Sequence, residues 1–423
     1  MSARYALAIL LLATPLFSRG AALSRPERGI VAAVDARREA AIELLARVVD
    51  IPSATENHAG VREVGEIFGA ELRALGFETK WVELPGEVNR AGHLVAERKG
   101  TKGARILLIG HLDSVLQGEP YRREGSRGYG SGAADMKGGD VVIVEALRAL
   151  HTEGALEGRQ IIVVMTGDEE KPGSPHDVTR AALVDAASRS DVALAFEGYA
   201  PGTAVTGRRG ICDWRLETTG SQGHSSTIFG EARGSGAIFE ASRILSAFHD
   251  GLREPYLTYN PGLFLGGTET SLPEGSSGGT ATGKHNVVAR SAIVEGDLRF
   301  LSAAQLARAQ EAMRAIVAKN LPKTTATIRF DLNMPSMAPT EGNRALLHAL
   351  DGVSRDLGTG PMGEHDPSQR GAGDISFVAH LVDGLDGLGA LGEQEHAPGE
   401  YIELDELPNL IKRTALLIHR LTR

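Results

Sequence analysis

Histidines and carboxylates recur in five short segments of this chain, most of them directly after an apolar run. Two segments contribute a histidine, His111 and His396, and all of them contribute aspartates or glutamates. Imidazole nitrogens and carboxylate oxygens hold divalent cations in proteins, and two neighbouring cations can turn bound water into a nucleophilic hydroxide. The segments are residues 110–113, 135–139, 167–170, 196–198 and 395–396. Together they favour a di-metal hydrolase.

The first two segments each have an ordinary alternative. His111 and Asp113 lie two positions apart, so on an extended backbone their side chains share a face. This suits a metal-binding histidine whose other ring nitrogen is held by Asp113, although such pairs also occur on plain surfaces and in cores. Asp135 could bridge two cations or merely cap the helix that follows it. The glycine-rich run 128–132 brings the backbone close to a neighbouring group, and a bridging carboxylate would explain that crowding.

Two adjacent acids, Glu169 and Glu170, follow another apolar run, where they repel each other unless positive charge is near. At the end of a strand their side chains point to opposite sides, so one can bind a metal while the other takes a proton from bound water. A solvated acidic loop is the alternative. Glu197 is similarly ambiguous, and His396 is one of 13 histidines. Only the joint placement of these residues predicts a site.

Alternating helices and strands must position the first four segments. The apolar spacing predicts helices at 59–75, 140–150 and 179–188 and strands at 93–96, 105–109, 160–165 and 191–196. Short apolar strands separated by helices indicate an α/β fold with a mostly parallel, twisted sheet that has helices on both faces. His111, Glu170 and Glu197 then lie just past the carboxyl ends of three strands. Open α/β sheets bind their ligands at that edge.

The pattern changes after Gly210. Alternating strands are predicted at 211–218, 292–300 and 325–332, and amphipathic helices at 234–249 and 302–320. These favour an inserted α+β domain at 209–334. The α/β character then returns, with helices predicted at 343–357, 375–381 and 406–421 and a strand at 385–391. Because His396 lies in this last part, the larger domain is expected to be discontinuous, at 25–208 and 335–423.

Residues 1–22 are typical of a secretory signal peptide. Arg4 precedes an apolar run, and small residues follow it near a cleavage site at Ala22. The run is shorter than the ~20 apolar residues of a membrane-spanning helix, so an uncleaved membrane anchor is the less favoured alternative. We therefore expect a secreted or periplasmic protein that has no membrane contact once the signal is removed.

Composition is compatible with an enzyme but does not identify one. The chain has 423 residues, of which 42% are hydrophobic, so it can bury more than one core, and we expect two domains. Its formal net charge is -9. Such a chain lacks the basic field that nucleic acids and anionic membranes require, so nucleic acid is not expected as a partner. Cys212 is the single cysteine, which excludes an intrachain disulfide and suits a small buried side chain at the start of a strand.

The motifs resemble those of a known family. They read Gly-His-Leu-Asp-Ser-Val at 110–115, Gly-Ser-Gly-Ala-Ala-Asp-Met-Lys-Gly-Gly at 130–139, Thr-Gly-Asp-Glu-Glu at 166–170, Phe-Glu-Gly at 196–198 and Gly-His-Ser-Ser at 223–226. In this order they resemble the di-zinc exopeptidases, or metallopeptidase family twenty, which include glutamate carboxypeptidases, aminoacylases and succinyl-diaminopimelate desuccinylase. The resemblance runs from about Arg37 to Leu421 and is specific for the family rather than for a substrate.

Residue by residue, the resemblance implies roles at the metal centre. It implies one zinc held by His111 and Glu197, a second held by Glu170 and His396, and Asp135 bridging the two. Glu169 would be the general base. Two Zn²⁺ per chain are thus expected, with Co²⁺ or Mn²⁺ as alternatives.

The resemblance also implies a fold and a partner. In this family a ferredoxin-like domain interrupts the catalytic α/β domain, dimerises and acts as a lid, which suits the change of pattern at 209–334. A lid histidine of such enzymes reaches the active site of the partner subunit. His224 occupies that motif here, so we expect a homodimer formed through the inserted domain.

Two further positions match the glutamate carboxypeptidase subgroup, and a third is a candidate for substrate binding. Asn286 and Arg299 are thirteen residues apart, as in that subgroup, and Gly371 lies where many relatives have a glycine-rich stretch. The planar guanidinium of Arg299 suits a free carboxylate, although it could instead pair with Asp297 or Glu295 on the strand surface.

The chain also departs from the family's pattern. Where many relatives have a glycine-rich stretch with a Thr-Asp pair, residues 370–375 read Arg-Gly-Ala-Gly-Asp-Ile and lack the threonine, and Glu395 directly precedes His396. The Gly/Ser/Thr-rich segment 266–284 could be a mobile loop over the pocket or a tolerated insertion.

These observations predict a zinc exopeptidase that cleaves an amide bond next to a free carboxylate in a small peptide, most like a glutamate carboxypeptidase. An aminoacylase acting on N-acyl amino acids is the alternative within the same class. A dimeric metal-binding or ligand-binding protein without catalysis is the alternative outside it, but the expected base and metal-binding positions are all filled.

Overall fold

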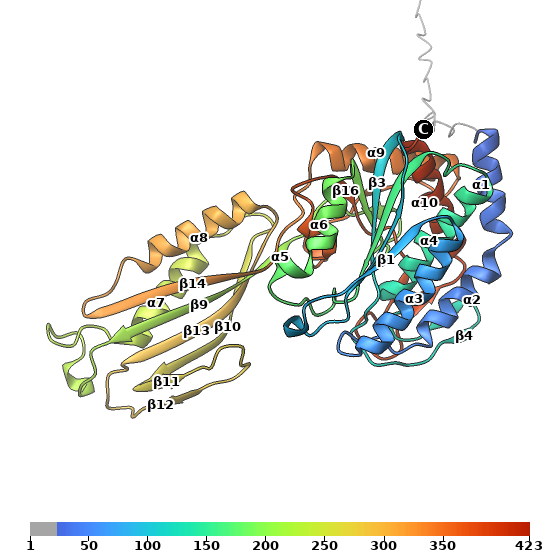
Figure 1. The fold of residues 1–423 in the computed structure, drawn as a ribbon. Coiled ribbons are helices and arrows are strands. Elements are labelled where there is room, and N and C mark those ends of the chain that lie inside the picture. The colour runs from blue at the N-terminus through green and yellow to red at the C-terminus, as the bar shows by residue number, and fades with distance from the viewer. Residues whose placement is uncertain (1–22) are drawn as a thin grey trace, which may run out of the picture.

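The computed structural model describes residues 23–423, so the signal peptide predicted at 1–22 lies outside the described residues. The chain forms a larger domain and a smaller domain that extends from it (Figure 1). Within the described residues, no helix has both the length and the apolar content needed to span a bilayer.

The larger domain contains a six-stranded sheet that is mostly parallel. In spatial order its strands are β1 (Glu78–Val82), β2 (His93–Arg98), β6 (Arg159–Thr166), β3 (Lys102–His111), β7 (Val192–Ala195) and β16 (Asp383–Leu385). Strands β6, β3, β7 and β16 are parallel neighbours, whereas β2 pairs antiparallel with both β1 and β6. The mostly parallel α/β sheet predicted from sequence is therefore confirmed.

Both faces of this sheet are covered, because its central strands are apolar on both sides. In β3, Ile106 and Leu108 join one hydrophobic cluster while Leu107 and Ile109 join another on the opposite face. The first cluster includes residues of α1 (Arg25–Asp35), α2 (Arg38–Val49), α3 (His58–Ala74), α4 (Gly138–Thr152), α9 (Glu341–Asp356) and α10 (Leu407–Leu421). The second includes residues of α6 (Ala181–Ser188) and of the short turn η5 (Asp374–Phe377) (Figure 1).

The smaller domain has the ferredoxin-like order of elements. Along the chain these are β9 (Gly210–Gly220), α7 (Ala237–Gly251), β10 (Thr258–Gly267), β13 (Ser291–Phe300), α8 (Ala303–Val317) and β14 (Thr324–Met334). The strands pair antiparallel in the spatial order β10-β13-β9-β14. The two helices pack on one face of this sheet around Trp214 and Phe248, which gives the domain its own core. Cys212 is buried there, as expected.

Short elements complete the fold and connect the two domains. They are η1 (Gly86–Val88), β4 (Arg122–Glu124), β5 (Arg127–Tyr129), η2 (Ala133–Lys137), α5 (His176–Thr179), β8 (Thr203–Ala204), η3 (Ser225–Thr227), β11 (Glu269–Ser271), β12 (Thr280–Thr282), β15 (Gly363–Glu364), η4 (Pro367–Gln369), β17 (Gly392–Glu393) and β18 (Tyr401–Glu403). Strands β17, β18, β5 and β4 form a small sheet, so the segment before Asp135 and the segment around His396 are held side by side.

Some sequence predictions are wrong. The helix predicted at 375–381 is only the short turn η5, whose apolar side chains pack directly on the main sheet. The strand predicted at 385–391 ends at Leu385, because the chain turns at Gly387, which has a φ of 73°. Strand β10 was not predicted, since Pro261 and a bulge interrupt its alternation. The Gly/Ser/Thr-rich segment 266–284 contains the hairpin β11-β12.

Candidate active site

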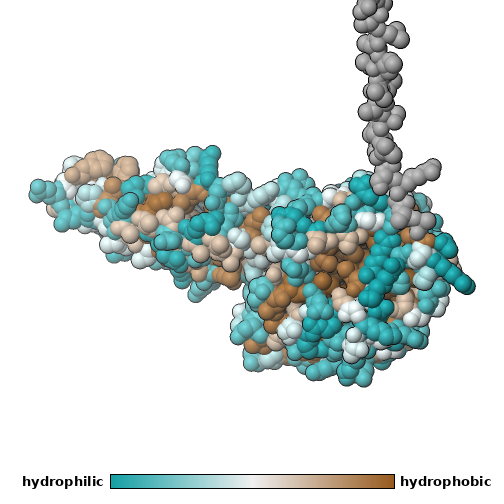
Figure 2. Space-filling view, turned by 90° about the horizontal axis from the view of Figure 1, so that it is seen from above, coloured by the Kyte–Doolittle hydropathy of each residue, from teal (hydrophilic) through white to brown (hydrophobic). Residues whose placement is uncertain are grey.

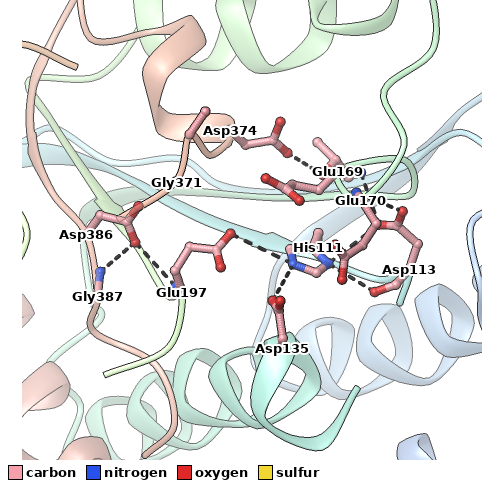
Figure 3. A network of polar contacts seen from close by, with 12 residues as sticks. His111, Asp113, Asp135, Glu169, Glu170, Glu197, Gly371, Asp374, Asp386 and Gly387 are labelled. Carbon is pink, nitrogen blue, oxygen red and sulfur yellow. Dashed lines mark hydrogen bonds and ion pairs between the residues drawn. The ribbon is translucent and has the colours of Figure 1, made fainter. Parts of the chain in front are cut away.

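Asp135 lies between two histidines from distant parts of the chain. Its Oδ1 is 3.1 Å from Nε2 of His111, and its Oδ2 is 2.9 Å from Nε2 of His396. His396 Nε2 is also 3.3 Å from Oε2 of Glu170, and His111 Nε2 is 3.8 Å from Oε1 of Glu197. The structure therefore brings all five predicted metal-binding residues together around the Asp135 carboxylate. Figure 3 shows four of them, His111, Asp135, Glu170 and Glu197.

The parallel strands explain most of this geometry. His111 is the last residue of β3, while Glu170 and Glu197 follow the adjacent strands β6 and β7. Their side chains meet because the carboxyl ends of parallel strands share one edge of the sheet. Asp135 reaches the same edge from the turn η2, and His396 from the loop between β17 and β18.

Asp113 contributes differently from the prediction. The ring nitrogen Nδ1 of His111 donates to the backbone carbonyl of Asp113 over 3.0 Å, whereas the carboxylate Oδ1 is 3.5 Å away. The buried carboxylate instead accepts hydrogen bonds from the backbone N–H groups of Glu169 and Glu170, over 3.1 and 3.2 Å, and from the Thr55 hydroxyl over 2.7 Å. Asp113 thus orients His111 through its backbone and fixes the two glutamates through its side chain.

The charges at the site are strongly coupled. Burial and the negative charge of Asp135 raise the pKa of Glu197 to about 8, and burial together with Glu197 raises the pKa of Glu169 well above its usual value. The hydrogen bonds with Asp135 and Glu170 raise the pKa of His396 to about 11. Burial alone would raise the pKa of Asp135, but the hydrogen bonds from the two histidines lower it. So many buried carboxyl groups can all be ionised only if further positive charge lies close to them.

The residues present fit a pair of divalent cations. Potential ligand atoms of His111, Glu169 and Glu197 lie within 4.8 Å of one another, as do those of His111, Asp135 and Glu170. In addition, Oε1 of Glu170 is buried without a hydrogen-bond partner. A mixed set of imidazole and carboxylate donors suits zinc, cobalt or manganese. The carboxylates would then share cations instead of repelling each other.

Glu400 is a supporting residue that sequence reasoning missed. Its buried carboxylate accepts hydrogen bonds from the backbone N–H groups of Gly132, Ala134 and Asp135, over 2.7, 2.8 and 3.0 Å. It follows His396 by four residues, so one loop carries both a candidate ligand and the anchor of the Asp135 segment. A carboxylate four residues after a candidate ligand was the only signal available, and it is a weak one.

A buried ion-pair network behind Glu169 was also missed. Arg180 donates to the side chains of Asp168 and Asp374, both over 2.7 Å, and to the backbone carbonyl of Asp168 over 3.1 Å. Asp374 also accepts a 2.5 Å hydrogen bond from the hydroxyl of Thr166. These contacts tie the end of β6, which leads into Glu169, to η5. No sequence pattern indicates that Arg180 contacts Asp374, because the two residues are far apart along the chain.

Gly371 and Arg299 share a hollow of about 420 Å³ at the junction of the two domains. Its lining also includes Arg209 and Arg370. Arg370 donates to the carbonyl of Gly198, directly after Glu197, so the hollow adjoins the metal-binding cluster. Nε of Arg299 donates to Asp297 over 2.7 Å, which is the pairing that the sequence left open, while the arginine still lines the hollow.

His224 and Asn286 are not brought to this cluster. They are neighbours in the smaller domain, where the N–H of Ser225 donates to the carbonyl of Asn286 over 2.9 Å. The loop after β9 that carries His224 lies at the end of this domain remote from the larger domain (Figure 1). Asn286 precedes β13, whereas Arg299 is near its other end. The structure therefore separates Asn286 from Arg299 within one chain.

Comparison with known proteins decides the family. Residues 107–420 match the model of "Peptidase family M20/M25/M40". The chain belongs to peptidase family M20/M25/M40. Carboxypeptidase G2 of Pseudomonas sp. (strain RS-16) is 26% identical over 417 residues, which cover 95% of this chain and 94% of that protein.

Solved structures show the same fold. Aminopeptidase PepT from Bacillus cereus matches with a TM-score of 0.73 at 19% identity, covering 91% of this chain and 99% of that one. The Bacillus subtilis YXEP protein, described as a dinuclear metal-binding peptidase from the M20 family, matches with a TM-score of 0.62 at 14% identity, covering 91% and 98%. This M20 chain is accordingly a metallo-hydrolase that acts on amide bonds.

Proposed function

We propose that this M20 enzyme is a zinc-dependent exopeptidase that cleaves an amide bond next to a free carboxylate, in the manner of a glutamate carboxypeptidase. The observation that carries the proposal is the hollow lined by Arg209, Arg299 and Arg370, which adjoins the metal-binding cluster. Guanidinium groups bind carboxylates through planar, charge-assisted hydrogen bonds. A carboxylate held there would place the neighbouring amide close to Glu197 and Glu169.

The residues of the cluster suit hydrolysis by an activated water. Two bound zinc ions would supply Lewis acidity and lower the pKa of a shared water. His111 and Glu197 would hold one ion, Glu170 and His396 the other, and Asp135 both. Glu169, whose backbone N–H is fixed by Asp113, would take the proton of the water and deliver it to the leaving amine.

The smaller domain is proposed to act as a lid and as the interface of a homodimer. Its surface exposes Phe229, Phe239 and Phe264, with exposed fractions of 69%, 52% and 41%. The space-filling view shows it as a narrow lobe with hydrophobic residues on its surface (Figure 2). Association through such residues would let His224 and Asn286 serve the partner's active site, where an imidazole can stabilise the oxyanion. Given residues 1–22, we also propose that the mature protein is secreted or periplasmic.

A substrate panel tests the proposed reaction. Zinc-loaded mature protein is assayed on dipeptides and N-acyl amino acids, each with a free or an amidated terminal carboxyl. We expect hydrolysis of the free forms only, and Arg299→Met should raise KM for them more than it lowers kcat. Preference for dipeptides would indicate a carboxypeptidase, and preference for N-acyl amino acids an aminoacylase. Equal turnover of amidated and free forms would rule out the role given to Arg299.

A further inference from the structure

Arg208 lies where the chain passes between the two domains. Its backbone N–H donates to the carbonyl of Met337 over 2.9 Å, and the N–H of Met337 donates to the carbonyl of Arg208 over 3.0 Å. Residues near 208 carry the chain into β9, and residues near 337 return it from β14. This pair therefore joins the two interdomain crossings, and a rotation of the smaller domain must pass through or beside it.

The side chain of Arg208 points back into the larger domain. It is only 3% exposed, and its Nε donates to Oδ2 of Asp386 over 2.5 Å. Its Nη1 donates to the carbonyls of Gly371 and Ala372, over 3.1 and 3.0 Å. The guanidinium thus holds the backbone of Ala372 and of Gly371, and Gly371 lines the hollow between the domains.

Asp386 extends this contact to the metal-binding cluster. Its Oδ1 accepts hydrogen bonds from the backbone N–H groups of Glu197 and Gly387, over 3.3 and 2.5 Å (Figure 3). Only one carboxylate therefore separates Arg208 from the backbone of Glu197. Because Asp386 is fully buried, its position follows that of the guanidinium with which it pairs.

Gly373 lies directly against the guanidinium of Arg208. A Cβ at Gly373 would lie 3.1 Å from Cζ and 3.3 Å from both Nε and Nη1 of Arg208. These atoms cannot easily withdraw, because hydrogen bonds fix them on two sides. A side chain at position 373 would therefore press on the guanidinium and shift it by a few tenths of an ångström against those hydrogen bonds.

We propose that Arg208 is a positioning residue that couples the orientation of the smaller domain to the metal ligand Glu197 and to the segment 371–373, of which Gly371 lines the hollow. Rotation about the Arg208–Met337 pair would move the guanidinium, and with it Asp386 and both attached segments. The inference rests on the proposed metal-binding role of Glu197 and on no particular substrate.

The test measures the separation of the domains with and without zinc. Spin labels are attached at Glu157→Cys in the larger domain and Glu311→Cys in the smaller one, with buried Cys212 changed to Ala. Distance distributions are recorded by pulsed electron paramagnetic resonance, without metal and with saturating Zn²⁺. We expect zinc to narrow the distribution in this reference protein and in Arg329→Lys, an exposed control on β14. Arg208→Lys keeps the positive charge but lacks the planar guanidinium with its several N–H donors. In this variant zinc should no longer narrow the distance distribution, although the protein binds as much zinc as the reference protein.

A second variant keeps the proposal testable should Arg208→Lys not fold. Gly373→Ala should weaken the zinc-dependent narrowing by displacing the guanidinium, and where Arg208→Lys folds, adding Gly373→Ala to it should have no further effect. Unchanged narrowing in Arg208→Lys or in Gly373→Ala, or no effect of zinc on the reference protein, would overturn the proposal. Because no substrate enters this measurement, failure of the proposed peptidase reaction in the substrate panel remains a separate result.

Discussion

The Glu400 carboxylate accepts a 3.0 Å hydrogen bond from the backbone N–H of Asp135, the residue whose two oxygens contact both candidate metal-binding histidines. Because the same carboxylate also holds Gly132 and Ala134, it fixes the backbone from which Asp135 projects. Residues that orient a metal ligand in this way affect affinity without touching the metal.

Glu400→Gln should therefore weaken zinc binding. An amide nitrogen in place of one carboxylate oxygen would face backbone N–H donors, so at least one hydrogen bond is lost. We expect zinc affinity to fall by about 10- to 100-fold, measured by competition with a chelator. Glu403→Gln is the matched control, since Glu403 pairs with Arg127 away from Asp135. Equal affinities of the two variants would contradict the role given to Glu400.

Glu169→Gln should abolish hydrolysis while both metal ions remain bound. Glutamine keeps the shape of the side chain but cannot accept a proton from water, and the loss of general base catalysis lowers kcat by about 10²- to 10⁴-fold. Metal content by mass spectrometry and kcat on the best substrate of the panel are the measurements. Substantial residual turnover with two metals per chain would exclude Glu169 as the base.

Arg180→Met should destabilise the fold strongly. The substitution leaves Asp168 and Asp374 buried without their common partner, and uncompensated buried charges cost about 3–5 kcal/mol. Urea unfolding measures the loss. Arg189→Met, which breaks pairs of a half-exposed arginine with Glu97 and Asp185, should cost about 1 kcal/mol or less. A loss for Arg180→Met no greater than this control would refute the argument.

The residues of the site that follow parallel strands could be predicted from the sequence. His111, Glu170 and Glu197 directly end or follow apolar strands, and a parallel sheet brings such positions to one edge. Asp135 and His396 were candidates by residue type alone, and their roles came from the family resemblance, because they reach the edge from a turn and a loop. Glu400 and Arg180 could not be predicted, since their partners lie in segments far away along the chain.

The separation of Asn286 from Arg299 within one chain could not be predicted from the sequence either. Their spacing of thirteen residues matches the pattern of the subgroup. Asn286 precedes β13 and Arg299 is near its far end, and because an extended strand advances by about 3.3 Å per residue, the two residues lie far apart within one chain. Spacing along a strand identifies the family, whereas it does not identify which residues meet in one active site.

Glu27 is predicted to make stability depend on acid pH. Burial alone would raise the pKa of Glu27, but hydrogen bonds with Ser24 and Arg420 lower it to about 2 from its ordinary value of 4.5. The folded-state pKa is thus depressed, so the stabilisation is complete above about pH 4.5 and is lost as the pH falls towards about 2. A shift of this size corresponds to a contribution on the order of 3 kcal/mol at neutral pH.

Glu27→Gln should accordingly lower the free energy of unfolding at pH 7, and the difference from the parent protein should shrink as the pH falls from about 5 to about 2. Chemical denaturation at several pH values measures it. Glu43→Gln, at an exposed position of α2, is the control and should change stability by less than about 0.5 kcal/mol. A difference between Glu27→Gln and the parent that is constant with pH would contradict the assigned cause.

Mixing two inactive variants should restore activity if His224 serves the partner's active site. His224 and Glu169 lie in different domains, and the loop that carries His224 is at the end of the smaller domain remote from the larger one. In a mixed dimer of His224→Ala and Glu169→Gln, one of the two sites combines an intact Glu169 with an intact His224. Random exchange of subunits should then recover about a quarter of the parent activity, because half of the dimers are mixed and each has one complete site. Each variant alone is the control. No recovery after proven subunit exchange would show that His224 acts within its own chain or not at all.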